Sequence, residues 1–161
     1  MLRDKSLIPL SHQHQRALAL CVRIDRASLI PEADLIPWQK EIGQLFQSEI
    51  AIHFTAEEQG LFPVASKFPE LAPLVEELFG DHATLREYFD QAKNENMSPA
   101  DVSAFAQRLS AHIRKEERRL FQRLQELLNP EELANLGVQL TDALKEATVA
   151  CALPTLRPPH K

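Results

Sequence analysis

Two segments of this sequence repeat one short phrase of histidine, glutamate and apolar residues. Residues 53–62 and residues 112–121 both read His-x-x-x-Glu-Glu-x-x-Leu-Phe. Residues four positions apart lie on the same face of an α-helix, so an imidazole nitrogen and a carboxylate oxygen could reach one ion or two adjacent ions. Imidazole and carboxylate ligands together suit iron, manganese or zinc. The phrase therefore predicts metal ligands at His53, Glu57, His112 and Glu116.

The apolar residues that precede each phrase indicate that these four side chains point into the protein. His53 and Glu57 continue a helical stripe of apolar residues, and His112 and Glu116 continue another. Burying an unpaired carboxylate costs several kcal/mol, so two buried glutamates need compensating charge. A cation bound between them would supply it.

Two further histidines occupy positions that face the same interior. His82 is in register with the apolar positions of the run over 70–94, and His14 precedes Leu18 by one helical turn. His12 is the alternative on that segment, because residues two apart cannot share one helix face; we predict His14. Four imidazoles and two bridging carboxylates supply about eight bonds, whereas two octahedral ions take about twelve. Open positions for a small exogenous ligand would remain.

The second glutamate of each phrase is expected to play a lesser part. Glu58 and Glu117 fall about 100° further around their helices than Glu57 and Glu116. We expect them at the surface or behind the ligands. Alanine at either should change metal content little, whereas alanine at Glu57 or Glu116 should remove metal.

The elements that position these residues are all expected to be helical. Amphipathic runs cover about 11–28, 38–60, 70–94 and 99–128, and a shorter fifth run covers about 130–148. Ser11 is the expected N-cap of the first helix, Ser98 and Pro99 begin the fourth, and Gly60 and Pro63 end or weaken the second. No segment alternates with period two. These patterns predict an all-α fold, an antiparallel up-down-up-down four-helix bundle with the short C-terminal helix packed outside.

Length, charge and hydropathy narrow the class of protein. The 161 residues predict one domain over 1–150, followed by a flexible Pro-rich tail over 151–161. A net charge of −5 disfavours nucleic acid as a partner. No apolar run is long enough to cross a membrane, and the N-terminus lacks the pattern of a signal peptide. We therefore expect a cytoplasmic protein with no membrane partner.

The sequence resembles the hemerythrin-like, or HHE cation-binding, family over about residues 8–148. The resemblance rests on the two phrases, on Leu-Ser-His-Gln-His over 10–14, and on Asp81 followed by His82. It implies a pair of oxo- or hydroxo-bridged non-haem irons, held by terminal histidines and bridging glutamates. The implied ligands are His14, His53, His82, His112, Glu57 and Glu116.

The resemblance also implies what such a centre could do. One role is binding or sensing a small ligand such as dioxygen or nitric oxide, or sensing iron. The alternative is a redox enzyme that reduces peroxide or oxygen, or an iron donor that repairs iron centres. A third possibility is a helical interaction module without metal. The sequence contains no substrate site or electron-donor motif, which favours the first role.

One position departs from the family's oxygen carriers. They have another histidine four residues after the histidine of the third helix, whereas this chain has Arg86 there. The departure argues against specialised reversible oxygen carriage. Arg86 either points away from the centre or places a positive charge near an anionic ligand.

The choice between the two neighbouring histidines of the first helix is testable. His14→Ala should lower the metal content of the purified protein, because it removes a ligand, and His12→Ala should not. Metal analysis of the two variants beside the unmodified protein checks this. The opposite ranking would show that His12 is the ligand.

Overall fold

A computed structural model describes residues 2–27 and 29–150, with side chains described to residue 145; the predicted tail over 151–161 lies outside these ranges. The described residues form helices and no strand, which confirms the predicted all-α class. The α-helices are α1 (Ile8–Arg26), α2 (Leu35–Leu45), α3 (Ala51–Ala56), α4 (Phe62–Ala65), α5 (Ala72–Lys93), α6 (Pro99–Lys115), α7 (Phe121–Leu127) and α8 (Pro130–Ala150). A 3₁₀ turn, η1 (Glu32–Asp34), and three π-helical turns, η2 (Phe46–Ile50), η3 (Glu57–Leu61) and η4 (Glu116–Leu120), complete the set.

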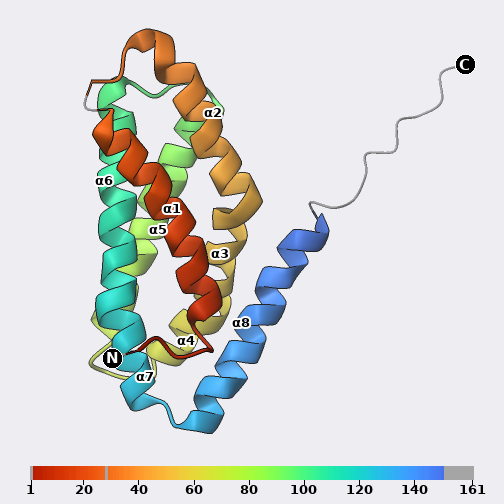
Figure 1. The fold of residues 1–161 in the computed structure, drawn as a ribbon. Helices are drawn as coiled ribbons and strands as arrows, with labels where there is room; N and C mark the ends of the chain where they lie inside the picture. Colours follow the sequence, from red (N-terminus) through yellow and green to blue (C-terminus); the bar gives the residue numbers. More distant parts are fainter. Residues whose placement is uncertain (1, 28, 151–161) are drawn as a thin grey trace, which may run out of the picture.

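The π turns join short helices into long helical stretches. One stretch runs from α2 to α4 over 35–65, and another runs from α6 to α7 over 99–127. Together with α1 and α5 they lie side by side, and successive stretches alternate in direction (Figure 1). α1 contacts α6, α5 contacts both α2 and α6, and α8 lies outside against α3 and η3.

Local chemistry accounts for where two of the helices begin. The Ser98 hydroxyl accepts a hydrogen bond from the backbone of Asp101, whose side chain accepts one from the Ser98 backbone, with Pro99 following; this confirms the predicted start of α6. The predicted cap at Ser11 is wrong. α1 begins at Ile8, because Pro9 fits the first helical turn, where no backbone donor is needed.

The long stretch over 35–65 does not end where the sequence predicts. Gly60 and Pro63 lie within it, and the helix continues to Ala65. At the end of η3 the Phe62 backbone N–H bonds the carbonyl of Glu57, five residues back. Pro63 follows just after the π turn, in the first turn of α4. The π turn thus accommodates the proline.

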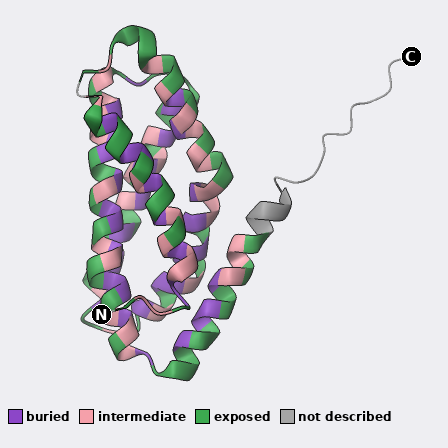
Figure 2. Cartoon of the chain, viewed as in Figure 1, coloured by how far each residue is buried: buried purple, intermediate pink, exposed green. Residues whose placement is uncertain are grey.

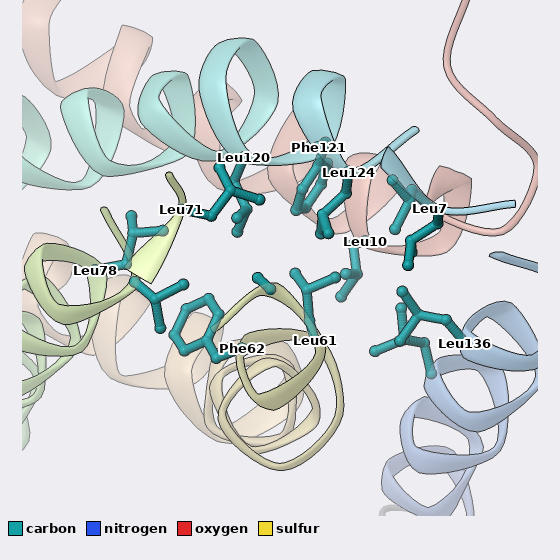
Figure 3. Close-up of a cluster of buried hydrophobic side chains, with 14 of the residues drawn as sticks. Leu7, Leu10, Leu61, Phe62, Leu71, Leu78, Leu120, Phe121, Leu124 and Leu136 are labelled. Atoms are coloured by element: carbon teal, nitrogen blue, oxygen red, sulfur yellow. The ribbon is translucent and has the colours of Figure 1, made fainter. Parts of the chain in front are cut away.

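Buried apolar side chains form two clusters towards opposite ends of the long helices. The first combines the start of α1, the region around α4, the start of α5, α7 and α8; Leu10, Phe62, Phe121 and Leu136 belong to it (Figure 3). The second contains apolar residues of α1, α2, α3, α5 and α6. Purple buried segments accordingly run along the inner sides of all these helices (Figure 2). No helix within the described ranges has both the length and the apolar character that a membrane crossing needs.

Two helical glycines should respond oppositely to alanine. A Cβ on Gly43 would meet no atom within 4 Å, whereas a Cβ on Gly137 would lie 2.7 Å from the Ser6 Cβ and 2.9 Å from its Cα. Gly43→Ala should raise the free energy of unfolding by about 0.5–1 kcal/mol through helix propensity. Gly137→Ala should lower it, because α8 must move away from Ser6. Denaturant unfolding of both variants measures this; equal stabilisation would show that α8 does not pack against Ser6 in solution.

Candidate metal centre

The structure brings all six sequence-predicted ligands together between the two apolar clusters. His14 lies on α1, His53 on α3, His82 on α5 and His112 on α6, while Glu57 and Glu116 are the first residues of η3 and η4. Each is between 0 and 2% exposed. His12, the alternative to His14, is exposed on the outer side of α1. The choice of His14 therefore agrees with the geometry.

The six side chains form two overlapping groups, each able to hold an ion. His14 and His53 form one group with both glutamates, and His82 and His112 form the other with the same glutamates. Within each group one ligand atom of every residue lies within 4.8 Å of the others. The Nε2 atoms of His14 and His53 are 2.9 Å apart, and those of His82 and His112 are 3.2 Å apart. The two glutamates are thus shared.

Each glutamate turns one oxygen towards each group. Glu57 Oε1 lies 3.1 Å from His53 Nε2, and its Oε2 lies 3.3 Å from His82 Nε2. Glu116 Oε2 lies 3.2 Å from His14 Nε2, and its Oε1 lies 3.2 Å from His112 Nε2. A carboxylate with its two oxygens directed at two different ligand groups is placed to bridge two ions.

The donor set passes two tests of fit to metal. Ligand atoms at about 2.1 Å from one ion, on adjacent corners of an octahedron, lie about 3 Å apart, which matches the nitrogen–nitrogen and nitrogen–oxygen spacings. All four oxygens of Glu57 and Glu116 are buried without a hydrogen-bond partner. Buried carboxylate oxygens are rarely left in this state, and coordination would satisfy them.

The raised pKa values of two histidines also indicate that the site is suited to positive charge. Burial by itself would lower the pKa of His14, but the negative carboxylates of Glu116 and Glu117 close to its ring outweigh it and raise the pKa to about 9. Burial also opposes protonation of His112, and the charge of Glu116 with hydrogen bonding to Asp81 raises its pKa to about 10. The two buried carboxylates therefore attract positive charge, which protons supply when no metal does.

Each of the four histidines of the centre is oriented by a hydrogen bond from its outer nitrogen. The Nδ1 of His14 donates to Glu117 at 2.7 Å, and that of His82 donates to Glu58 at 2.8 Å. The other two histidines use a neutral amide and an aspartate: His53 donates to Gln13 at 2.7 Å and His112 donates to Asp81 at 3.3 Å. With Nδ1 as the donor, Nε2 faces the centre, and its lone pair is free for an ion once the ring is neutral, as metal-ligating histidines require.

The structure explains why the two glutamates, the leucine and the phenylalanine recur in the repeated phrase. The first glutamate reaches the centre, and the second orients the histidine of a neighbouring helix: Glu58 holds His82, and Glu117 holds His14. The leucine is fully buried in the first apolar cluster in both phrases. The final phenylalanine lies against the same neighbouring histidine, with ring centroids 5.3 Å apart for Phe62 and His82 and 5.6 Å for Phe121 and His14.

Two points of the sequence interpretation change accordingly. Glu58 and Glu117 lie behind the ligands, one of the two places expected for them, and each accepts a hydrogen bond from a ligand histidine. Their replacement should therefore weaken metal binding, and not leave it nearly unchanged as expected from the sequence. A π turn begins at the first glutamate of each phrase and includes the second, so the residues do not follow regular α-helical spacing. The repetition of Glu-Glu was the available signal, whereas the parts played by Gln13 and Asp81 had none beyond adjacency to His14 and His82.

Arg86 neither points away from the centre nor enters it. It donates to the two oxygens of Glu58 at 2.7 and 3.1 Å, and Glu58 is the acceptor for His82. The position that holds a further histidine in oxygen carriers therefore adds no ligand here. Each ligand group contains two histidines.

Fold and site together define an all-α protein with two adjacent cation-binding groups that share two buried glutamates. A family model for the hemerythrin HHE cation binding domain matches residues 9–124, a range that contains all six residues of the centre. The chain belongs to this family, which confirms the predicted resemblance. Neither a curated protein nor a solved structure matches the chain.

The glutamates behind the histidines give a test that separates orientation from surface charge. Glu58→Ala and Glu117→Ala should each weaken metal binding about 10- to 100-fold, because the histidine loses the acceptor that fixes its tautomer and direction. Glu49→Ala is the control, since Glu49 pairs with exposed Arg16. Competition with a chelator measures the affinities. Unchanged binding in both variants, as in the control, would show that these glutamates do not orient the ligands.

Proposed function

We propose that this chain binds two non-haem irons between its four histidines and two glutamates and uses them to bind or sense a small ligand. The ligand class is dioxygen or nitric oxide, or the signal is iron itself. The observation that carries the proposal is the shared pair of glutamates, each with one oxygen towards each histidine pair. A site for a single ion would not need two carboxylates placed in this way.

The ligand count leaves room for a further molecule. Each ion would receive two imidazole nitrogens and one oxygen from each glutamate, four donors against about six for an octahedral ion. Bound iron would supply reversible redox chemistry and open coordination positions. The protein supplies enclosure: with all six ligands at most 2% exposed, a molecule that reaches them without rearrangement of the helices has to be small.

Family membership supports cation binding in general, and the donor types favour iron, with manganese and zinc as competing ions. Zinc is usually four-coordinate, so the four donors of each group would fill its positions. Iron is proposed because mixed imidazole and carboxylate donors with vacant positions are the set that oxygen-reactive iron uses.

A second role is favoured by one feature. Position 86 holds an arginine that pairs with Glu58, so it supplies no histidine to the centre. Each ion would therefore have two histidines and would keep open positions. Two open ions suit a redox reaction with peroxide or oxygen, or the release of iron to a damaged iron centre, better than they suit a dedicated carrier. We therefore retain such redox or iron-donor activity as the alternative.

Metal content and visible absorption distinguish these roles. Protein produced with ample iron should carry about two irons per chain, and Glu57→Ala and Glu116→Ala should lose them, since each removes a bridge. The spectrum is then recorded under argon, in air and under argon again. A change that reverses supports ligand binding or sensing, and irreversible oxidation with turnover of peroxide supports the alternative. Protein without iron, or with only manganese or zinc, would contradict the di-iron proposal.

A further inference from the structure

Arg86 belongs to a chain of contacts that ends on one ligand. Its guanidinium donates to both oxygens of Glu58, at 2.7 and 3.1 Å, and Glu58 accepts the Nδ1 hydrogen bond of His82. The same guanidinium lies over the ring of Phe54, 5.3 Å from its centroid. Phe54 in turn stacks on His82, with centroids 3.7 Å apart and planes at 14°. Arg86 thus touches both groups that hold this histidine.

Arg3 makes a related set of contacts at another ligand, although it meets the carboxylate through one nitrogen and its Nη1 donates to Gln125 Oε1 at 3.0 Å. Its Nη2 donates to Glu117 Oε2 at 2.6 Å and to the Glu117 carbonyl at 2.7 Å, and Glu117 accepts the Nδ1 hydrogen bond of His14. The Arg3 guanidinium carbon lies 5.1 Å from the centroid of Phe121. Phe121 stacks on His14 at 5.6 Å and 16°. Arg3 precedes α1 and lies outside residues 9–124, so the family match does not account for it.

The contacts of Arg86, and in part those of Arg3, use properties that only arginine combines. A planar guanidinium can pair with a carboxylate through two N–H groups and cover an aromatic face at the same time, whereas an ammonium group cannot. The histidine ring is held at its edge by the glutamate and on its face by the phenylalanine. Arginine fixes these two supports relative to each other, and so fixes the ring between them.

The two arginines act on different ligand groups. His82 belongs to the group completed by His112, and His14 belongs to the group completed by His53. Arg86 is 39% exposed and Arg3 is 22% exposed at the side chain, so both connect the buried centre to the surface.

We propose that Arg3 and Arg86 are positioning residues of the metal centre, each setting the direction and donor strength of one histidine and hence the affinity of one ion. The proposal rests on the proposed binding of two ions. It assigns the segment before α1 to the centre, because Arg3 reaches Glu117 from there.

The test uses the full-length chain with Arg3→Gln, Arg86→Gln, the double variant and the two lysine variants. Arg16→Gln is the matched control, since Arg16 forms a two-bonded pair with Glu49 on the exposed surface. Ferrous iron is titrated anaerobically against a competing chelator, and the electron paramagnetic resonance signal of the half-oxidised centre is recorded. Thermal unfolding of the metal-free proteins measures structural effects separately.

Each glutamine variant should bind one of the two ions about 10- to 100-fold more weakly and change the signal, as loss of an outer partner does elsewhere. The double variant should weaken both ions, and the lysine variants, which keep charge without the planar fork, should stay weaker than the unmodified protein. Arg16→Gln should match the unmodified protein. If a glutamine variant does not fold, its lysine counterpart carries the comparison.

Two results would overturn this inference while leaving the di-iron proposal intact. One is an unmodified protein that takes up two irons while all arginine variants keep its affinities and signal. The other is weakening that merely follows the loss of thermal stability of the metal-free protein, which would make the arginines structural. An unmodified protein that takes up no iron would remove the proposed function itself.

Discussion

The centre of this molecule depends on two carboxylates that are wholly buried between apolar clusters. Glu57 and Glu116 are 0% exposed, and none of their oxygens has a hydrogen-bond partner. Negative charge in such surroundings must be matched by positive charge held close to it. Protons on histidines supply it in the metal-free chain, and bound cations would supply it otherwise. Both states need imidazole nitrogens and carboxylate oxygens gathered in the same place.

The rest of the molecule serves to hold that geometry. The long helices place one histidine each on an inner face, and the apolar clusters towards their two ends keep these faces together. Acceptors at the outer nitrogens then select the tautomer of each ring. In the repeated phrase one glutamate enters the centre while the next orients a histidine from a different helix, as Glu117 does for His14. The phrase therefore also links helices to one another.

The functional consequence is a small, enclosed centre with two similar halves. Membership of the hemerythrin HHE cation-binding family and the buried histidine and glutamate groups agree on metal binding. The proposed di-iron role adds that both ions would retain vacant positions, since Arg86 supports Glu58 instead of contributing a ligand. Such a centre suits a diatomic ligand, iron sensing or a small oxidant. The halves differ in one acceptor, the neutral Gln13 against the charged Asp81, so the two ions would not be equivalent.

Helical periodicity and spacing were enough to predict the all-α class, the six residues of the centre and their inward direction, because these depend on residues within a few turns of one another. A local exception was missed where a π turn changed the spacing, because the helix continues past Gly60 and Pro63. Glu58 and Glu117 were expected at the surface or behind the ligands, and they lie beneath neighbouring histidines. Only tertiary structure decided which side chains support which ligands. Glu117 and His14 are 103 positions apart, and Arg3 reaches both Glu117 and Phe121 from before the first helix. Such contacts leave no periodic signal in a sequence, since they arise only when separate helices pack together.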